Sequence, residues 1–224
     1  MLRDIYSRFR GACTMLFRKQ GNQVVFAGTA VLVHPEGFLL TAANLFAPND
    51  ELVISFWDEE RTFISTERES VAPYHAKVLR HDEDRGLALL QIQETIEISM
   101  PPHVIGKPDS IVTGSSLASL GYAFGYQHIY NQVIQQAVVS ARILSGNGTK
   151  LFLFDSMLHE GSRGGPLINV KDRRIIGINY GKFKPHEATS EAYQGSPTGD
   201  TNMSYAISIE YGVDLMEKEG IEIL

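Results

Sequence analysis

The sequence has little of several features that mark whole classes of protein. A single cysteine, Cys13, stands among 224 residues, so no disulfide can form within the protein, as is typical of a reducing compartment or a disulfide-free fold. Cys13 lies in an apolar run and is expected in the core. No apolar run approaches the roughly 18 residues of a membrane helix, and the N-terminus lacks the apolar centre of a secretory signal. The expected location is the cytoplasm, or the periplasm or exterior if a signal has been removed.

An excess of basic charge is also missing. The formal net charge is −6, which gives no indication of nucleic-acid binding. Phosphate-binding glycine loops, Cys/His zinc spacing and calcium-loop patterns do not occur in the sequence. The mixed-sign run 80–85 is typical of a solvated loop rather than a metal site. We therefore expect neither a cofactor nor a metal. Apolar content of 43% and charged content of 21% are ordinary for a soluble globular protein.

Short apolar segments separated by turn residues dominate the sequence and favour an all-β barrel or sandwich. The predicted strands are 12–18, 23–33, 38–41, 51–57, 72–80, 87–92, 116–122, 132–143, 150–156, 166–170, 173–180 and 203–207. Apolar residues at helical spacing predict a short helix over 2–10. A second helix is expected over 209–219, with Ser208 as its N-cap and Gly220 closing it.

Three segments are expected to lack strands or helices. Residues 59–70 form a polar loop, and residues 93–115, with three prolines, form a connector between two halves of the protein. The third segment, Gly181–Asn202, holds three glycines and two prolines without apolar periodicity. Loops of this length are usually functional or unstructured. It is interpreted either as a surface insertion or as a cover or recognition loop.

The most distinctive stretch reads Gly161-Ser162-Arg163-Gly164-Gly165-Pro166-Leu167. Three glycines in five residues predict a tight turn, because glycine adopts positive φ and lets a neighbouring group approach closely. Such a turn can direct successive backbone N–H groups toward one point and form an anion cradle. The alternative is a plain glycine-rich connection between two strands.

This stretch resembles the nucleophile loop of the trypsin/chymotrypsin-like serine proteases, which usually reads Gly-Asn-Ser-Gly-Gly-Pro-Leu. Further stretches are similar, in the same order, to motifs of that family or of its bacterial HtrA/Deg branch. They are Gly28-Thr29-Ala30 with Leu39-Leu40-Thr41-Ala42-Ala43-Asn44, then Asp82-Glu83-Asp84-Arg85-Gly86-Leu87-Ala88-Leu89-Leu90, then Gly121-Tyr122-Ala123-Phe124-Gly125, and last Tyr205-Ala206-Ile207-Ser208. Together they extend over about residues 11–215.

The resemblance implies two packed six-stranded antiparallel β-barrels, with a short N-terminal helix and a C-terminal helix. The whole sequence, 1–224, would be a single trypsin-like domain. Its expected parts are a first barrel over 11–93, a connector over 94–115, a second barrel over 116–207, and the C-terminal helix and tail over 208–224.

The resemblance also aligns the family's His-Asp-Ser triad with Asn44, Gly86 and Arg163. An asparagine amide is not a base near neutral pH, glycine has no side chain to orient an imidazole, and arginine carries only donors. The sequence therefore predicts no catalytic residue. It predicts a pseudoprotease that binds an unidentified protein or peptide, or acts as a scaffold. The loop that carries the oxyanion donors in the family, here Gly161, Ser162, Arg163 and Gly164, is expected to persist.

Several alternatives stay open at this point. Arg163, with Asn44 beside it, either binds a carboxylate, from an acidic side chain or from the C-terminus of a polypeptide, or pairs internally and closes the cleft. An active endopeptidase would need Ser162 as a displaced nucleophile and a base such as His159. Asp84 lies too far along its strand to replace the missing acid. The third alternative is a structural subunit of a larger assembly.

Overall fold

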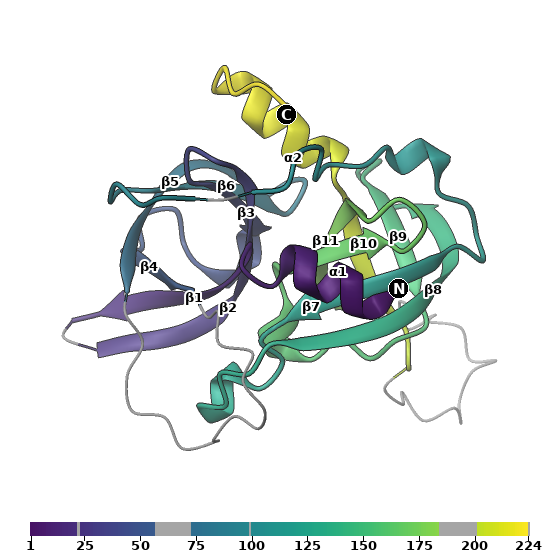
Figure 1. Ribbon diagram of the computed structural model, residues 1–224, viewed down its shortest axis with the longest axis horizontal. Coiled ribbons are helices and arrows are strands. Elements are labelled where there is room, and N and C mark those ends of the chain that lie inside the picture. Colours follow the sequence, from purple (N-terminus) through teal and green to yellow (C-terminus); the bar gives the residue numbers. More distant parts are fainter. Residues whose placement is uncertain (22, 57–72, 99, 184–200, 224) are drawn as a thin grey trace.

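Two closed antiparallel β-barrels lie side by side in the structure (Figure 1). A computed structural model describes residues 1–21, 23–56, 73–98, 100–183 and 201–223. The first barrel has the strand order β1-β2-β3-β6-β5-β4, with β1 (Cys13–Gln20), β2 (Gln23–His34), β3 (Phe38–Ala42), β4 (Leu52–Ser55), β5 (Tyr74–Asp82) and β6 (Leu87–Ile92). The second has the order β10-β11-β12-β9-β8-β7, with β7 (Ser116–Gly121), β8 (Val133–Leu144), β9 (Lys150–Phe154), β10 (Pro166–Asn169), β11 (Arg174–Lys182) and β12 (Ser204–Ser208). The predicted fold class is confirmed.

The apolar core follows the alternation of the strands. Successive side chains of a strand point to opposite faces, and β6 uses both of them. Leu90 belongs to a cluster inside the first barrel, whereas Leu89 belongs to a cluster that continues into the second barrel. Cys13 is fully buried in the same shared cluster, and this burial raises the pKa of its thiol. The expectation that Cys13 is a core residue is confirmed.

Two α-helices pack on the barrels (Figure 1). The first, α1 (Leu2–Phe9), contacts β7 and β8, and the i, i+4 pair Ile5 and Phe9 is fully buried. The second, α2 (Glu210–Lys218), contacts β6 of the first barrel and β12 of the second. It therefore bridges the two barrels. Within the described residues, no helix has the length and apolar character needed to cross a membrane.

The ends of α2 confirm one expectation and correct another. Gly220 N–H donates to Glu217 O, and the next N–H donates to Met216 O, so Gly220 closes the helix as predicted. The prediction of Ser208 as N-cap is wrong: the N-cap is Ile209, and no side-chain cap is present. Ser208 still pairs in β12, and its hydroxyl lies 3.3 Å from a Glu210 carboxylate oxygen. The strand continues one residue further than its sequence pattern indicates.

Two of the expected loops fall largely outside the described residues. The predicted polar loop 59–70 lies entirely outside them. Of the predicted loop Gly181–Asn202, residues 184–200 lie outside, and its first two residues form the end of β11. Neither interpretation of that loop is therefore tested.

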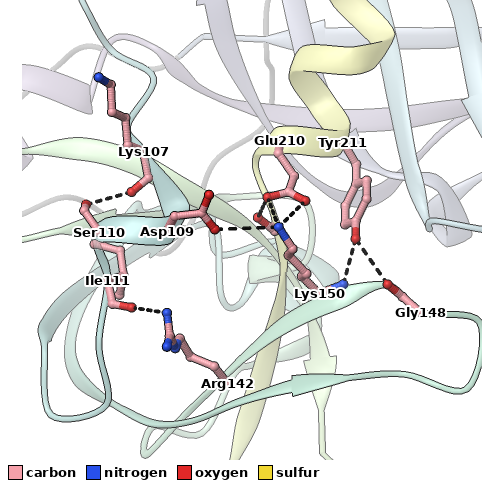
Figure 2. A network of polar contacts seen from close by, with 10 residues as sticks. Lys107, Asp109, Ser110, Ile111, Arg142, Gly148, Lys150, Glu210 and Tyr211 are labelled. Atoms are coloured by element: carbon pink, nitrogen blue, oxygen red, sulfur yellow. Dashed lines mark hydrogen bonds and ion pairs between the residues drawn. The ribbon is translucent and has the colours of Figure 1, made fainter.

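A polar network ties α2 to the tip of the β8–β9 hairpin and to the connector (Figure 2). Lys150 Nζ lies 3.0 Å from a Glu210 carboxylate oxygen and 3.6 Å from Asp109 Oδ1. These carboxylates, Glu210 first, raise the pKa of the Lys150 ammonium.

Lys150 N–H donates to the Tyr211 hydroxyl oxygen at 2.9 Å. The Arg85 guanidinium, next to Gly86, stacks over the Tyr211 ring at 4.6 Å. Tyr211 thus joins the second barrel to the β5–β6 turn of the first.

Substitutions of Tyr211 are expected to distinguish the contribution of its hydroxyl to stability from that of its ring. Tyr211→Phe keeps the ring under Arg85 but removes the hydroxyl, and is expected to cost about 1 kcal/mol of unfolding free energy. Tyr211→Ala also removes the ring and its stacking, and is expected to cost about 2–3 kcal/mol. Urea unfolding measures both values. Equal losses for the two variants would contradict a role for the ring.

Candidate functional site

The glycine-rich stretch is pressed between the two barrels. It forms a 3₁₀ turn over Glu160–Ser162 and then enters β10. Thr29 of β2 holds it in place: Thr29 Oγ1 donates to the Gly161 carbonyl at 2.7 Å, and Thr29 N–H donates to the Arg163 carbonyl at 2.8 Å. A Cβ on Gly161 would stand 2.1 Å from the Tyr122 carbonyl oxygen. The close packing therefore requires glycine there.

The N–H groups of this loop already have acceptors. Ser162 N–H donates to His159 O at 2.9 Å and Arg163 N–H to Glu160 O at 3.2 Å. Gly164 N–H donates to the Asn179 carbonyl at 2.8 Å. Three of the four residues of the predicted oxyanion loop thus direct their N–H groups into the protein's own backbone. In this structure these donors are not turned toward an open anion site.

Ser162 faces away from the cleft. Its side chain is buried, with 2% of the residue exposed, and a Cβ on Gly121 would stand only 2.9 Å from Ser162 Oγ. The His159 ring packs at a tilt against the Phe124 ring, with 4.9 Å between the ring centroids. The structure therefore does not bring Ser162 and His159 together as a nucleophile–base pair, which would require a direct hydrogen bond.

Asn44 and Arg163 come together from different barrels. Asn44 lies in the 3₁₀ turn Ala43–Leu45 after β3 and is exposed. Arg163 follows the turn before β10, and its Nη2 lies 2.9 Å from Glu160 Oε1 and 2.8 Å from Oε2. Both side chains line one pocket of about 310 Å³, together with Glu160, Tyr180, Gly181, Lys182 and Tyr205. Arg163 is paired internally, and a pocket lies beside the pair.

Gly86 lies next to this pocket but is covered by Tyr180. Its φ is +79°, and a Cβ on it would stand 2.6 Å from Tyr180 Cε2. The Tyr180 ring lies 5.5 Å from the Tyr205 ring, centroid to centroid. Burial raises the pKa of both phenols, so both stay protonated and able to donate at neutral pH. Tyr180 thus fills the space into which a side chain at residue 86 would project.

Four pocket side chains were not predicted: Glu160, Tyr180, Lys182 and Tyr205. Only Glu160 has a local signal, since a 3₁₀ turn brings residues three apart onto one side and Glu160 stands three residues before Arg163. Asp84 lies elsewhere, in a second pocket of about 420 Å³ between the β5–β6 turn and α2. Among the residues with described positions, no three His, Cys, Asp or Glu side chains gather in a way that could hold a metal ion.

Comparison with known proteins defines the class. The family model described as "Trypsin-like peptidase domain" matches residues 28–178, and the chain belongs to this family.

Within it, the chain is similar to proteins of the HtrA type. It is 25% identical over 206 residues to a probable periplasmic serine endoprotease DegP-like of Hahella chejuensis, covering 90% of this chain and 37% of that protein. It is 24% identical over 194 residues to the protein of the same name from Ectopseudomonas mendocina, covering 85% and 34%. The chain therefore spans about a third of the length of these relatives. The solved HtrA-type protease AlgW with tripeptide superposes with a TM-score of 0.73 at 22% identity, covering 97% of this chain and 63% of that one.

Proposed function

We propose that this protein is a catalytically inactive member of the trypsin-like family that binds a protein or peptide in the cleft between its barrels. The observation that carries the proposal is the pocket shared by Asn44 and Arg163, in which Arg163 is paired with Glu160. The two residues stand where the family resemblance aligns the base and the nucleophile. Neither an amide nor a guanidinium performs those steps at neutral pH.

Gly86, the third of the aligned triad positions, supports the same proposal. The resemblance aligns Gly86 with the acid that orients the base, and Tyr180 covers the space beside it. Loss of a complete triad removes about 10⁶ of turnover in a well-studied protease. The peptide part of the proposal draws on relatives: AlgW was solved with a tripeptide and with a decapeptide. A trypsin-like fold in which the catalytic side chains are replaced still offers a cleft, which is suited to binding or scaffolding.

A serine-directed fluorophosphonate tests inactivity directly. We expect no mass adduct on the purified protein and no casein digestion, with trypsin as the positive control. Ser162→Ala is the matched variant for the rearranged active site. An adduct mapped to Ser162, with digestion that disappears in Ser162→Ala, would overturn the proposal.

The compartment is a separate part of the proposal. A single cysteine, Cys13, is typical of a reducing compartment such as the cytoplasm, whereas the relatives named above carry the word periplasmic in their names. Fractionation of source cells, with antibody detection of the full-length protein, distinguishes the two. Recovery with periplasmic markers would overturn the cytoplasmic location.

A further inference from the structure

We infer that the cleft pocket recognises a free carboxylate on Arg163, and that Glu160 occupies Arg163 until such a ligand displaces it. The inference rests on the proposed function, since it names the ligand class for the same cleft. The carboxylate comes either from a peptide C-terminus or from an aspartate or glutamate side chain. The experiment below separates these two sources.

The side chains around the pocket are mostly hydrogen-bond donors. Arg163 and Lys182 are cations with donors only, and the amide of Asn44 supplies two more N–H groups. Tyr180 and Tyr205 line the same space, and their hydroxyls remain protonated at neutral pH because burial raises the pKa of each. Among the described lining side chains, Glu160 is the one that only accepts. A lining of this kind is complementary to an acceptor-only anion.

The Glu160 carboxylate makes with Arg163 the kind of contact that we infer for the carboxylate of the ligand. Both of its carboxylate oxygens lie within 3 Å of one nitrogen, Arg163 Nη2, whereas a guanidinium carries five N–H donors. The Glu160 side chain is 58% exposed and that of Arg163 is 29% exposed. Ion pairs exposed to this degree contribute little stability. An external carboxylate can therefore compete for Arg163 while Glu160 turns into solvent.

The size of the pocket limits what can enter. Its volume of about 310 Å³ is at the lower end of the range for ligand pockets, roughly 300–1,000 Å³. That volume suits one side chain or the terminus of a peptide. The Tyr180 and Tyr205 rings, which lie against each other at a tilt of 38°, form its aromatic wall. A carboxylate with a short apolar neighbour matches both features.

Nuclear magnetic resonance titration of the ¹⁵N-labelled protein tests the inference with three probes. They are N-acetyl-trialanine with a free C-terminal carboxylate, its C-terminal amide, and an amidated tripeptide with one central glutamate. We expect one or both carboxylate probes to shift resonances of the pocket, and the plain amide not to. Binding of only the first probe assigns the site to a C-terminus, and binding of only the third assigns it to an acidic side chain. Equal shifts with all three, or none with any, would overturn the inference.

Variants with matched charge changes identify the recognising group. Arg163→Gln is expected to weaken carboxylate binding by about tenfold or more, and Glu160→Gln to tighten it several-fold. Arg173→Gln and Glu51→Gln make the same charge changes at exposed ion pairs outside the pocket, and are expected to change nothing. If Arg163→Gln does not fold, Arg163→Lys keeps the charge without the planar fork and is expected to bind more weakly than the unchanged protein.

The outcomes of this experiment and of the activity assay are independent. A protein that digests casein would end the proposed inactivity, whatever the probes do. An inactive protein whose probe binding is unchanged in Arg163→Gln and Glu160→Gln would leave the proposed function in place and overturn the carboxylate site.

Discussion

Gly86→Ala is expected to destabilise the protein by about 2–5 kcal/mol. The φ of Gly86 is +79°, a left-handed conformation in which other residues cost roughly 1–2 kcal/mol. A Cβ would also stand 2.6 Å from Tyr180 Cε2 and 2.8 Å from Ile207 Cδ1, and such overpacking adds about 1–3 kcal/mol. Urea unfolding measures the total, with an unchanged m-value as the sign that stability alone has changed.

Gly148 offers a closely matched control. Its φ is also +79°, but no atom lies within 4 Å of the position that its Cβ would take. Gly148→Ala is therefore expected to cost only the backbone part, about 1–2 kcal/mol. The difference between the two variants measures the collision with Tyr180 and Ile207. Equal losses would mean that Tyr180 moves aside without cost and would contradict its role as a fixed cover over Gly86.

The same collision predicts the result of placing the family's triad residues at the three aligned positions. We expect the triple variant Asn44→His, Gly86→Asp, Arg163→Ser to leave casein intact. A Cβ at residue 86 would already stand 2.6 Å from Tyr180 Cε2, so we expect Tyr180 to keep a carboxylate at residue 86 from an imidazole at residue 44. The double variant without Gly86→Asp is the matched control. Digestion by the triple variant but not by the double would show that the carboxylate reaches the imidazole past Tyr180, against this expectation.

The strands could be predicted because their signals are local. Each predicted strand segment has a counterpart among β1 to β12, since apolar alternation and turn residues mark strands without reference to distant parts of the sequence. Closure into barrels is different. The closing pairs, such as Leu16 with Ile54 and Leu167 with Ser119, join residues far apart in the sequence. Only the family resemblance implied them.

The pocket shows where local patterns stop being informative. The β11–β12 pairing shifts register between Asn179 and Gly181, which leaves Tyr180 as the extra residue. A bulge of this kind redirects a side chain, and Tyr180 packs toward Gly86 of the other barrel. Tyr205 meets it because the shifted register pairs Tyr205 with Gly181. The family resemblance predicted that Asn44 and Arg163 lie close together. The positions of Tyr180 and Tyr205 in the same pocket depend on the register shift in β11, which no sequence pattern marks.

Gly164→Ala is expected to cost at least about 4 kcal/mol, a large part of the total stability of a typical domain. The φ of Gly164 is +82°, and its Cβ would stand 2.0 Å from the Thr29 carbonyl oxygen and 2.2 Å from Thr41 Oγ1. Thr41 Oγ1 itself donates to Thr29 O at 2.7 Å. The Thr29 carbonyl and the Thr41 hydroxyl cannot move away without breaking the hydrogen bond between them. We therefore expect the variant to separate the glycine-rich loop from the first barrel.

Gly114→Ala is the control, because Gly114 has φ +88° with open space around its Cβ position. We expect it to cost about 1–2 kcal/mol, measured for both variants by urea unfolding, with gel filtration to report the folded fraction. Close packing against Thr29 and Thr41 thus explains why residue 164 is glycine, without any role in anion binding. The presence of Gly164 is therefore no sign of catalytic activity. If Gly164→Ala were as stable as Gly114→Ala, the loop could leave Thr29 easily. The N–H groups now bonded to carbonyls could then turn toward the cleft, and the loop itself would become the first place to look for residual catalysis.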